Sequence, residues 1–372
     1  MKEINEILKA YQKIDSGKTK AALATVIHVE GSSYRRMGAR MLVLESGQWI
    51  GGISGGCLEG DALLKAKQAM VQNKPRIVTY DTREEDAHQI GIGLGCNGLI
   101  QVLISPLLPD DERNPLEIFK NCVESRTENL LLTVTSLRGD LNEKVAVGDM
   151  FRFENDEQIL TELQTFDNAQ TILEDIHSVI KNRKSAFQNY SFSEENQLSV
   201  FIEYLPPNMH LVLYGSNYDI YPFARIGKEV GWKVSVVAAL KKLDKSVFSI
   251  ANRVVSNKTG SIEVDENTAL ILMAHDYKTD YNNLKKALIA KAFYIGVLGP
   301  KKRFEKMINQ MRAENFEFEA AQLSKIHAPV GLDIGATTPE EIAISIIAEI
   351  RAFFAKREGG FLRLRDKPIH DS

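Results

Sequence analysis

The sequence has few cysteines, no long apolar run and no marked excess of charge of either sign. Only three of its 372 residues are cysteine, which excludes a fold held together by disulfides. No apolar stretch approaches the roughly 18 residues of a membrane-spanning helix. The charged N-terminal segment also lacks the apolar core of a signal peptide. These absences predict a soluble, cytoplasmic protein with reduced thiols and no membrane partner.

Acidic and basic residues nearly balance, since 46 Lys and Arg stand against 49 Asp and Glu for a formal net charge of −3. Without a basic surplus, no nucleic-acid partner is expected. Hydrophobic residues make up 44% of the chain and charged residues 26%, which are ordinary values for a globular protein. At about 150 residues per domain, a chain of this length predicts two or three domains.

Three glycine-rich segments stand out in the N-terminal half. The first, 31–38, lies between two expected strands; the second, 51–57, precedes an expected helix; the third, 91–98, precedes an expected strand. Glycine lets backbone N–H groups approach a ligand closely, so such segments are candidate binding loops.

The first segment and the residues after it carry three arginines, Arg35, Arg36 and Arg40. Guanidinium groups bind phosphate through two parallel hydrogen bonds, so an anion site is one interpretation. A tight, solvated hairpin with surface arginines is the other, and spacing alone does not separate them.

Cys57 follows Gly55 and Gly56 and stands close to the start of the expected helix. A cysteine at a helix N-terminus has a thiolate stabilised by the helix dipole, which suits binding of a soft metal or transfer of sulfur. A small buried side chain at a crowded backbone position would explain Cys57 equally well.

The other two cysteines carry weaker signals. Cys96 also lies among glycines, but its distance from Cys57 is not that of a zinc site, and a disulfide between the two is disfavoured in a reducing compartment. Cys122 falls on an expected helix, where core packing is its expected role.

The pattern changes at Pro206 and Pro207, which disfavour regular structure on both sides. Beyond them, apolar strands alternate with amphipathic helices, and this alternation is typical of a parallel, doubly wound sheet. The stretch 154–199 is less regular and predicts a helix followed by a strand. We therefore predict two domains, 1–205 and 206–372.

The second half has a degraded form of the dinucleotide-binding fingerprint. Gly215 follows a strand and opens a helix, but Asn217 and Ile220 stand where the second and third small residues belong. Ala238 stands where an acidic residue would bind the ribose. These residues predict a Rossmann-like domain without tight NAD binding.

His275 follows the expected strand 269–274, at the end of a parallel strand where open α/β sheets bind ligands. A hydrogen-bonded loop histidine is the alternative. Further on, Thr338 and Glu341 form a capping box with Pro339 at the first helical position.

Taken together, the motifs resemble the XdhC/CoxI family of xanthine dehydrogenase accessory factors. The resemblance spans nearly the whole chain and is weakest over about 105–200. It rests on GSSYRRMGAR (31–40), SGGCLE (54–59), GLGC (93–96), YIGVLGP (294–300), IHAPVGLDIG (326–335) and TPEEIA (338–343). Asn217 and Ala238 depart from the family, where glycine and aspartate are usual.

The resemblance implies a mixed α/β N-terminal domain and a Rossmann-like C-terminal domain. It implies a maturation chaperone rather than a metabolic enzyme, one that binds molybdenum cofactor transiently. It also implies three partners: a cysteine desulfurase that supports sulfuration of the cofactor, a molybdenum hydroxylase that receives it, and a second copy in a homodimer. Combined with the loops above, it suggests that Cys57 faces the metal and that the cofactor site draws on Cys57, Cys96, Arg35, Arg36, Arg40, Gly55, Gly56 and His275.

Two other functions stay open at this point. An NAD(P)-dependent oxidoreductase would use the Rossmann-like domain and would bind nicotinamide measurably. A sulfur-carrying protein would use Cys57 as a persulfide acceptor, and the sequence does not distinguish it from a chaperone.

Overall fold

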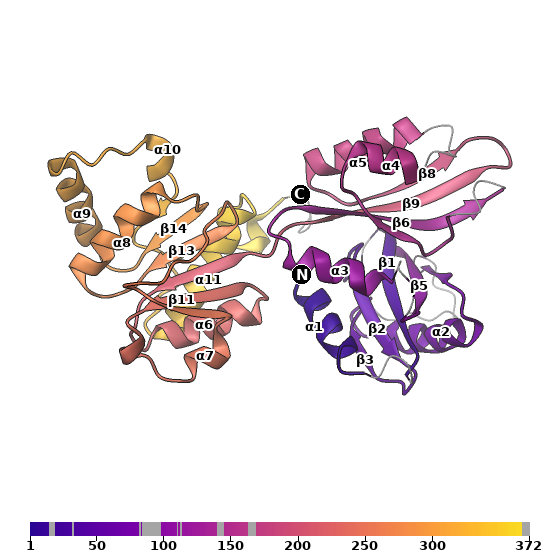
Figure 1. Ribbon diagram of the computed structural model, residues 1–372, viewed down its shortest axis with the longest axis horizontal. Coiled ribbons are helices and arrows are strands. Elements are labelled where there is room, and N and C mark those ends of the chain that lie inside the picture. The colour runs from indigo at the N-terminus through magenta and orange to yellow at the C-terminus, as the bar shows by residue number, and fades with distance from the viewer. Residues whose placement is uncertain are drawn as a thin grey trace. The chain divides into compact units, whose positions relative to one another are not determined.

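The computed structural model describes residues 1–14, 19–31, 33–81, 83, 98–109, 111, 114–139, 145–162 and 169–366. The chain forms two compact units, Met1–Pro207 and Asn208–Ser372 (Figure 1). We call them unit 1 and unit 2 and describe each by itself.

The first sheet of unit 1 has five strands in the order β3-β2-β1-β5-β4, and every neighbouring pair is antiparallel. The strands are β1 (Ala21–Gly31), β2 (Arg40–Leu44), β3 (Trp49–Gly51), β4 (Arg76–Asp81) and β5 (Gly98–Leu107).

The central strand of this sheet, β1, is buried on both faces. Ala22 and Ala24 pack with helix α2 (Glu59–Gln72), whereas Ala21 and Leu23 pack with helices α1 (Lys2–Tyr11) and α3 (Pro115–Glu124). Because side chains alternate along a strand, burial on both faces gives β1 its almost continuous apolar sequence.

A second antiparallel sheet completes unit 1, in the order β7-β6-β9-β8. Helices α4 and α5 cover one of its faces (Figure 1), and their apolar side chains share a core with β6 and β9. The elements are β6 (Asn129–Arg138), β7 (Met150–Arg152), α4 (Asp156–Glu162), α5 (Ala169–Asn182), β8 (Ala186–Ser191) and β9 (Gln197–Leu205).

Unit 2 is a six-stranded parallel sheet in the order β12-β11-β10-β13-β14-β15. Numbered from the first strand of the unit this is 3-2-1-4-5-6, the doubly wound Rossmann order, which reverses direction between β10 and β13. The strands are β10 (His210–Tyr214), β11 (Lys233–Ala238), β12 (Arg253–Ser256), β13 (Thr268–Leu272), β14 (Tyr294–Val297) and β15 (Ile326–His327). The longer helices are α6 (Ile220–Glu229), α8 (Tyr277–Ile289), α9 (Lys301–Ala313) and α11 (Pro339–Phe354), and short helices are α7 (Val247–Ile250) and α10 (Ala320–Leu323).

The expected fold class, a mixed α/β unit followed by a Rossmann-like parallel sheet, is confirmed. The capping box of Thr338 and Glu341 at the start of α11 is confirmed as well. The interpretation of 154–199 was incomplete, because the described part of this stretch contains α4, α5, β8 and the start of β9. Of the helices that the structure describes, none is long and apolar enough to cross a membrane.

Candidate functional site

The antiparallel pairing of the first sheet brings its glycine-rich loops to one end. β5 begins with Gly98 opposite Gly31, the last residue of β1, and β4 ends with Asp81 opposite Leu99. On the other side of β1, the start of β2 at Arg40 lies opposite Thr25, and β3 ends beside Met41. The loop after β1, the loop after β3 and the chain on either side of 84–97 therefore leave the sheet in the same direction.

Arg40, at the end of the loop 31–40, forms a buried ion pair with Glu203. Its side chain is only 2% exposed, donates to both carboxylate oxygens of Glu203 on β9, and lies 4.3 Å over the ring of Phe119. Gly38, at φ +86°, approaches this pair so closely that a Cβ there would lie 2.6 Å from Glu203. The guanidinium is thus engaged inside the protein, which argues against the cofactor contact that its sequence position suggested.

The other two arginines lie nearer the surface. Arg35 is half-buried and pairs with Glu3 of α1, whereas Arg36 is exposed. Tyr34 directly precedes Arg35 and is 73% exposed. A Cβ on Gly55 would lie 3.4 Å from the Tyr34 ring. The loop 31–40, which we call the arginine loop, and the loop 51–57, which we call the cysteine loop, therefore touch at this point.

Ser54 organises the cysteine loop. Its buried hydroxyl oxygen accepts hydrogen bonds from the backbone N–H groups of Gly56, Cys57 and Leu58, at 3.1 to 3.2 Å. The same hydroxyl donates to Glu59 at 2.5 Å and accepts the Cys57 thiol at 3.3 Å. These N–H groups, at the N-terminal side of α2, are satisfied internally and do not form an open phosphate cradle.

The carboxylate of Glu59 accepts further hydrogen bonds from the start of the cysteine loop. The backbone N–H groups of Ser54 and Ile53 donate to its carboxylate at 2.8 and 3.1 Å. Burial by itself would raise the pKa of Glu59, but the hydrogen bonds from Ser54 and the backbone outweigh it, and the net pKa lies below the usual range. A buried negative charge therefore stands behind the cysteine loop.

Cys57 is half-buried, and α2 begins two residues after it, at Glu59. Cys122 is fully buried on α3, where desolvation raises the pKa of its thiol to about 11. Cys96 lies outside the described residues. Within the described ranges, no three His, Cys, Asp or Glu side chains come together as a metal site.

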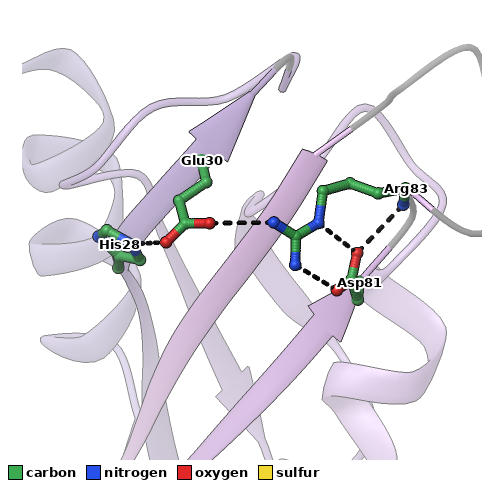
Figure 2. Close-up of polar contacts among 4 residues, drawn as sticks. All are labelled: His28, Glu30, Asp81 and Arg83. Atoms are coloured by element: carbon green, nitrogen blue, oxygen red, sulfur yellow. Dashed lines mark hydrogen bonds and ion pairs between the residues drawn. The ribbon is translucent and has the colours of Figure 1, made fainter.

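A polar cluster that the sequence did not indicate lies at the same end of the sheet. Glu30 lies 3.0 Å from Nε2 of His28 and accepts a hydrogen bond from Arg83 at 3.1 Å, and Arg83 also donates to both carboxylate oxygens of Asp81 (Figure 2). The hydrogen bond from His28 and the charge of Arg83 lower the pKa of Glu30. Arg83 thus compensates two carboxylates that would otherwise repel an anion at this end. The only sequence signal was polar residues at the ends of β1 and β4.

In unit 2, His275 follows β13 in the left-handed region, at φ +58°. Its Nε2 lies 2.5 Å from Oδ2 of Asp219, which precedes α6. Buried Asp280 accepts the N–H of Ala274 at 3.0 Å and pairs with Arg303 at 2.7 Å. Because a non-glycine residue is strained at positive φ, this support at Ala274 holds His275 in place.

The geometry around α6 also bears on dinucleotide binding. The Ser216 hydroxyl accepts the N–H of Ala239 at 2.9 Å and thereby ties the first turn to the end of β11. Asp219 lies at the N-terminus of α6, which is where a dinucleotide-binding domain would hold the negatively charged pyrophosphate. A carboxylate at this position repels phosphate.

Two family models match the chain. The XdhC and CoxI family model matches residues 16–81, and the XdhC Rossmann domain model matches residues 211–350. The chain belongs to the XdhC/CoxI family. The first match contains the arginine and cysteine loops and ends at Asp81; the second contains Asp219 and His275.

Three related proteins cover most of this XdhC/CoxI chain. A probable xanthine dehydrogenase subunit from Bacillus subtilis (strain 168) is 28% identical, over 89% of this chain and 92% of its own. The molybdenum cofactor insertion chaperone PaoD of Escherichia coli (strain K12) is 25% identical, over 92% and 85%. A crystal structure of a xanthine dehydrogenase from Bacillus halodurans matches with a TM-score of 0.70 at 26% identity, over 96% and 97%.

Proposed function

We propose that this protein carries molybdenum cofactor as cargo and delivers it to a molybdenum hydroxylase of the xanthine dehydrogenase type. The observation that carries the proposal is the contact of Tyr34 with Gly55, which joins the arginine loop to the cysteine loop at one end of the sheet. The guanidinium groups and the thiol at this end suit such a cargo, because the cofactor combines a phosphate group with sulfur ligands to a soft metal. The name of the Escherichia coli relative supports it.

Each side chain has a distinct part in the proposal. Arg36, exposed beside Tyr34, attracts the cargo phosphate, and Arg35 supports it while paired to Glu3. Cys57 faces the metal or its exchangeable sulfur, because it is the half-buried thiol of the loop. Gly55 and Gly56 place no side chain next to the Cys57 thiol, and a Cβ built on Gly56 would have no heavy atom within 4 Å. Arg40 acts through the loop it closes, and Cys96 is a second candidate thiol.

The partners in the proposal follow from the cargo. A cysteine desulfurase supplies sulfur to the bound cofactor, and the thiol of Cys57 is placed to take part in that exchange. The receiving enzyme is a molybdenum hydroxylase, and the protein acts in the cytoplasm as a homodimer. Light scattering that gives one chain's mass, 41.7 kDa, at micromolar concentration would argue against the dimer.

The test is metal and pterin analysis of the full chain purified from cells that make molybdenum cofactor. We expect the parent protein to co-purify with molybdenum and pterin, and Cys57→Ala to lose most of both while keeping its fold. Arg36→Gln should bind at least tenfold more weakly, because a charge-assisted hydrogen bond contributes about 1.5–3 kcal/mol.

Cys122→Ala is the matched control, since it removes a thiol that is buried in the core of unit 1. It should retain cofactor like the parent and change stability alone. If Cys57→Ala kept and delivered cofactor as the parent does, Cys57 would be a packing residue and the proposed site would be wrong.

A further inference from the structure

Unit 2 contains a cavity of about 120 Å³ that the carrier function does not use. Its polar groups come from the segments after β10 and β13, which supply Asp219 and His275, and from Thr337 before α11. This is the point where the order of the parallel sheet reverses, and open α/β sheets bind ligands there. Tyr218 and Pro339 also line the cavity, and the remaining wall is apolar: Phe223, Met273, Leu298, Ile342, Ala343 and Ile346.

The cavity holds one unused hydrogen-bond acceptor. The Asp219 side chain is 13% exposed; its Oδ2 is taken by His275, but its Oδ1 is buried and has no hydrogen-bond partner among the residues that the structure describes. A buried carboxylate oxygen without a partner costs free energy, and a ligand that donates an N–H to it removes that cost.

Phosphate does not fit this cavity. The two helix N-termini at its border already face carboxylates, since Asp219 precedes α6 and Glu341 accepts the N–H groups of Thr337 and Thr338 ahead of α11. The volume also excludes a dinucleotide, because an apolar cavity of about 150 Å³ holds one benzene ring. The site therefore suits a small, uncharged or cationic donor.

The cavity is also held in shape by groups outside it. Asp280 fixes Ala274 beside His275, and Arg303 donates to the carbonyl oxygen of Leu298 at 3.3 Å while paired with Asp280. One buried ion pair thus supports the two segments, after β13 and after β14, that form the wall. Such support is what a binding site needs and what a packing defect lacks.

We propose that this cavity binds the amino-bearing edge of a single-ring flat heterocycle, with Asp219 as the acceptor and the apolar side chains against the ring. Cytosine carries such an edge on one six-membered ring, whereas a fused two-ring system exceeds the volume. His275 holds the carboxylate in position through Oδ2, which leaves Oδ1 for the ligand. The inference concerns unit 2 alone and does not depend on the thiol site of unit 1.

The test compares two probes that differ at the amino group. Cytosine is titrated against uracil into the full chain by ligand-observed NMR or calorimetry. We expect cytosine to bind and uracil to bind at least tenfold more weakly, because a carbonyl in place of the amine meets a carboxylate.

Two variants complete the test. Asp219→Asn should remove the preference for the amino compound, and Ala343→Leu should block binding by filling the cavity. Glu263→Gln removes an exposed carboxylate of unit 2 that does not line the cavity, and it should leave binding unchanged. Equal binding of cytosine and uracil, no binding of either at millimolar concentration, or full binding of cytosine by Asp219→Asn would overturn the proposal. Cys57→Ala should leave these affinities intact, so the two proposals fail separately.

Discussion

Units 1 and 2 both place their polar chemistry at one end of a sheet, but they build that end in opposite ways. In unit 1 the antiparallel strands send loops outward, and internal hydrogen bonds centred on Ser54 and Glu203 fix the shape of those loops. Exposed side chains such as Tyr34 are left to meet a partner. In unit 2 the parallel strands surround a cavity, and the unused group, Asp219, lies inside it. The first end suits a large cargo that must be handed on, and the second suits a small ligand that is enclosed.

The largest expected effect tests whether unit 1 depends on its buried ion pair. Glu203→Ala leaves the Arg40 charge buried without a partner, which typically costs about 3–5 kcal/mol. Hydrogen exchange with peptide resolution should show loss of protection in unit 1 and not in unit 2. Glu117→Gln, which breaks an exposed pair with Lys120, is the control and should cost well under about 1 kcal/mol. Equal protection in Glu203→Ala and the parent would show that the pair does not hold the two sheets together.

The next prediction concerns the interpretation of unit 2 as something other than a dinucleotide site. We expect no saturable binding of NAD or NADP at millimolar concentration, because Asp219 stands at the helix N-terminus and Ala238 offers no acceptor for a ribose. Calorimetry on the full chain measures this directly. Micromolar affinity would revive the oxidoreductase interpretation and remove the contrast between the two sheet ends.

The smallest expected effect is the pH dependence that the capping box of α11 adds to the stability of unit 2. Hydrogen bonds from the backbone of Thr338 and Thr337 lower the pKa of Glu341 to about 2 from its ordinary 4.5. A carboxyl group with a depressed pKa stabilises the fold above its unfolded pKa, and this stabilisation is lost as the pH falls from about 4.5 towards 2.

Thermal melts between pH 5 and about 2.5 should therefore fall less steeply for Glu341→Gln than for the parent. Glu340→Gln, one residue away, has no such hydrogen bond in the described contacts and should behave like the parent. Identical slopes for Glu341→Gln and the parent would show that the capping box does not couple to pH.

The sequence predicted unit 2 well because its signals are local. Alternation of apolar strands and amphipathic helices depends on neighbouring residues, and the expected strand 269–274 corresponds to β13, Thr268–Leu272. The sequence also singled out His275, but not its partner Asp219, which lies 56 residues away.

The unpredicted part of unit 1 consists of long-range pairings. Arg40 has its partner 163 residues further along the chain, so its position in an arginine-rich loop suggested an anion site instead of an ion pair. The convergence of the loops depends on the strand order, and two of the five strands, 49–51 and 76–81, are too short or too polar to stand out. No local pattern reports which distant strand will pair with which.

The hydroxyl of Ser54 holds the cysteine loop in one conformation, and this affects the entropy change when a ligand binds there. It gathers three backbone N–H groups that a phosphate-binding loop would offer to its ligand, so the loop has its shape before any cargo arrives. Little conformational entropy is then lost on loading or regained on release. In the carrier role proposed above, the loop would therefore load and release its cargo without refolding.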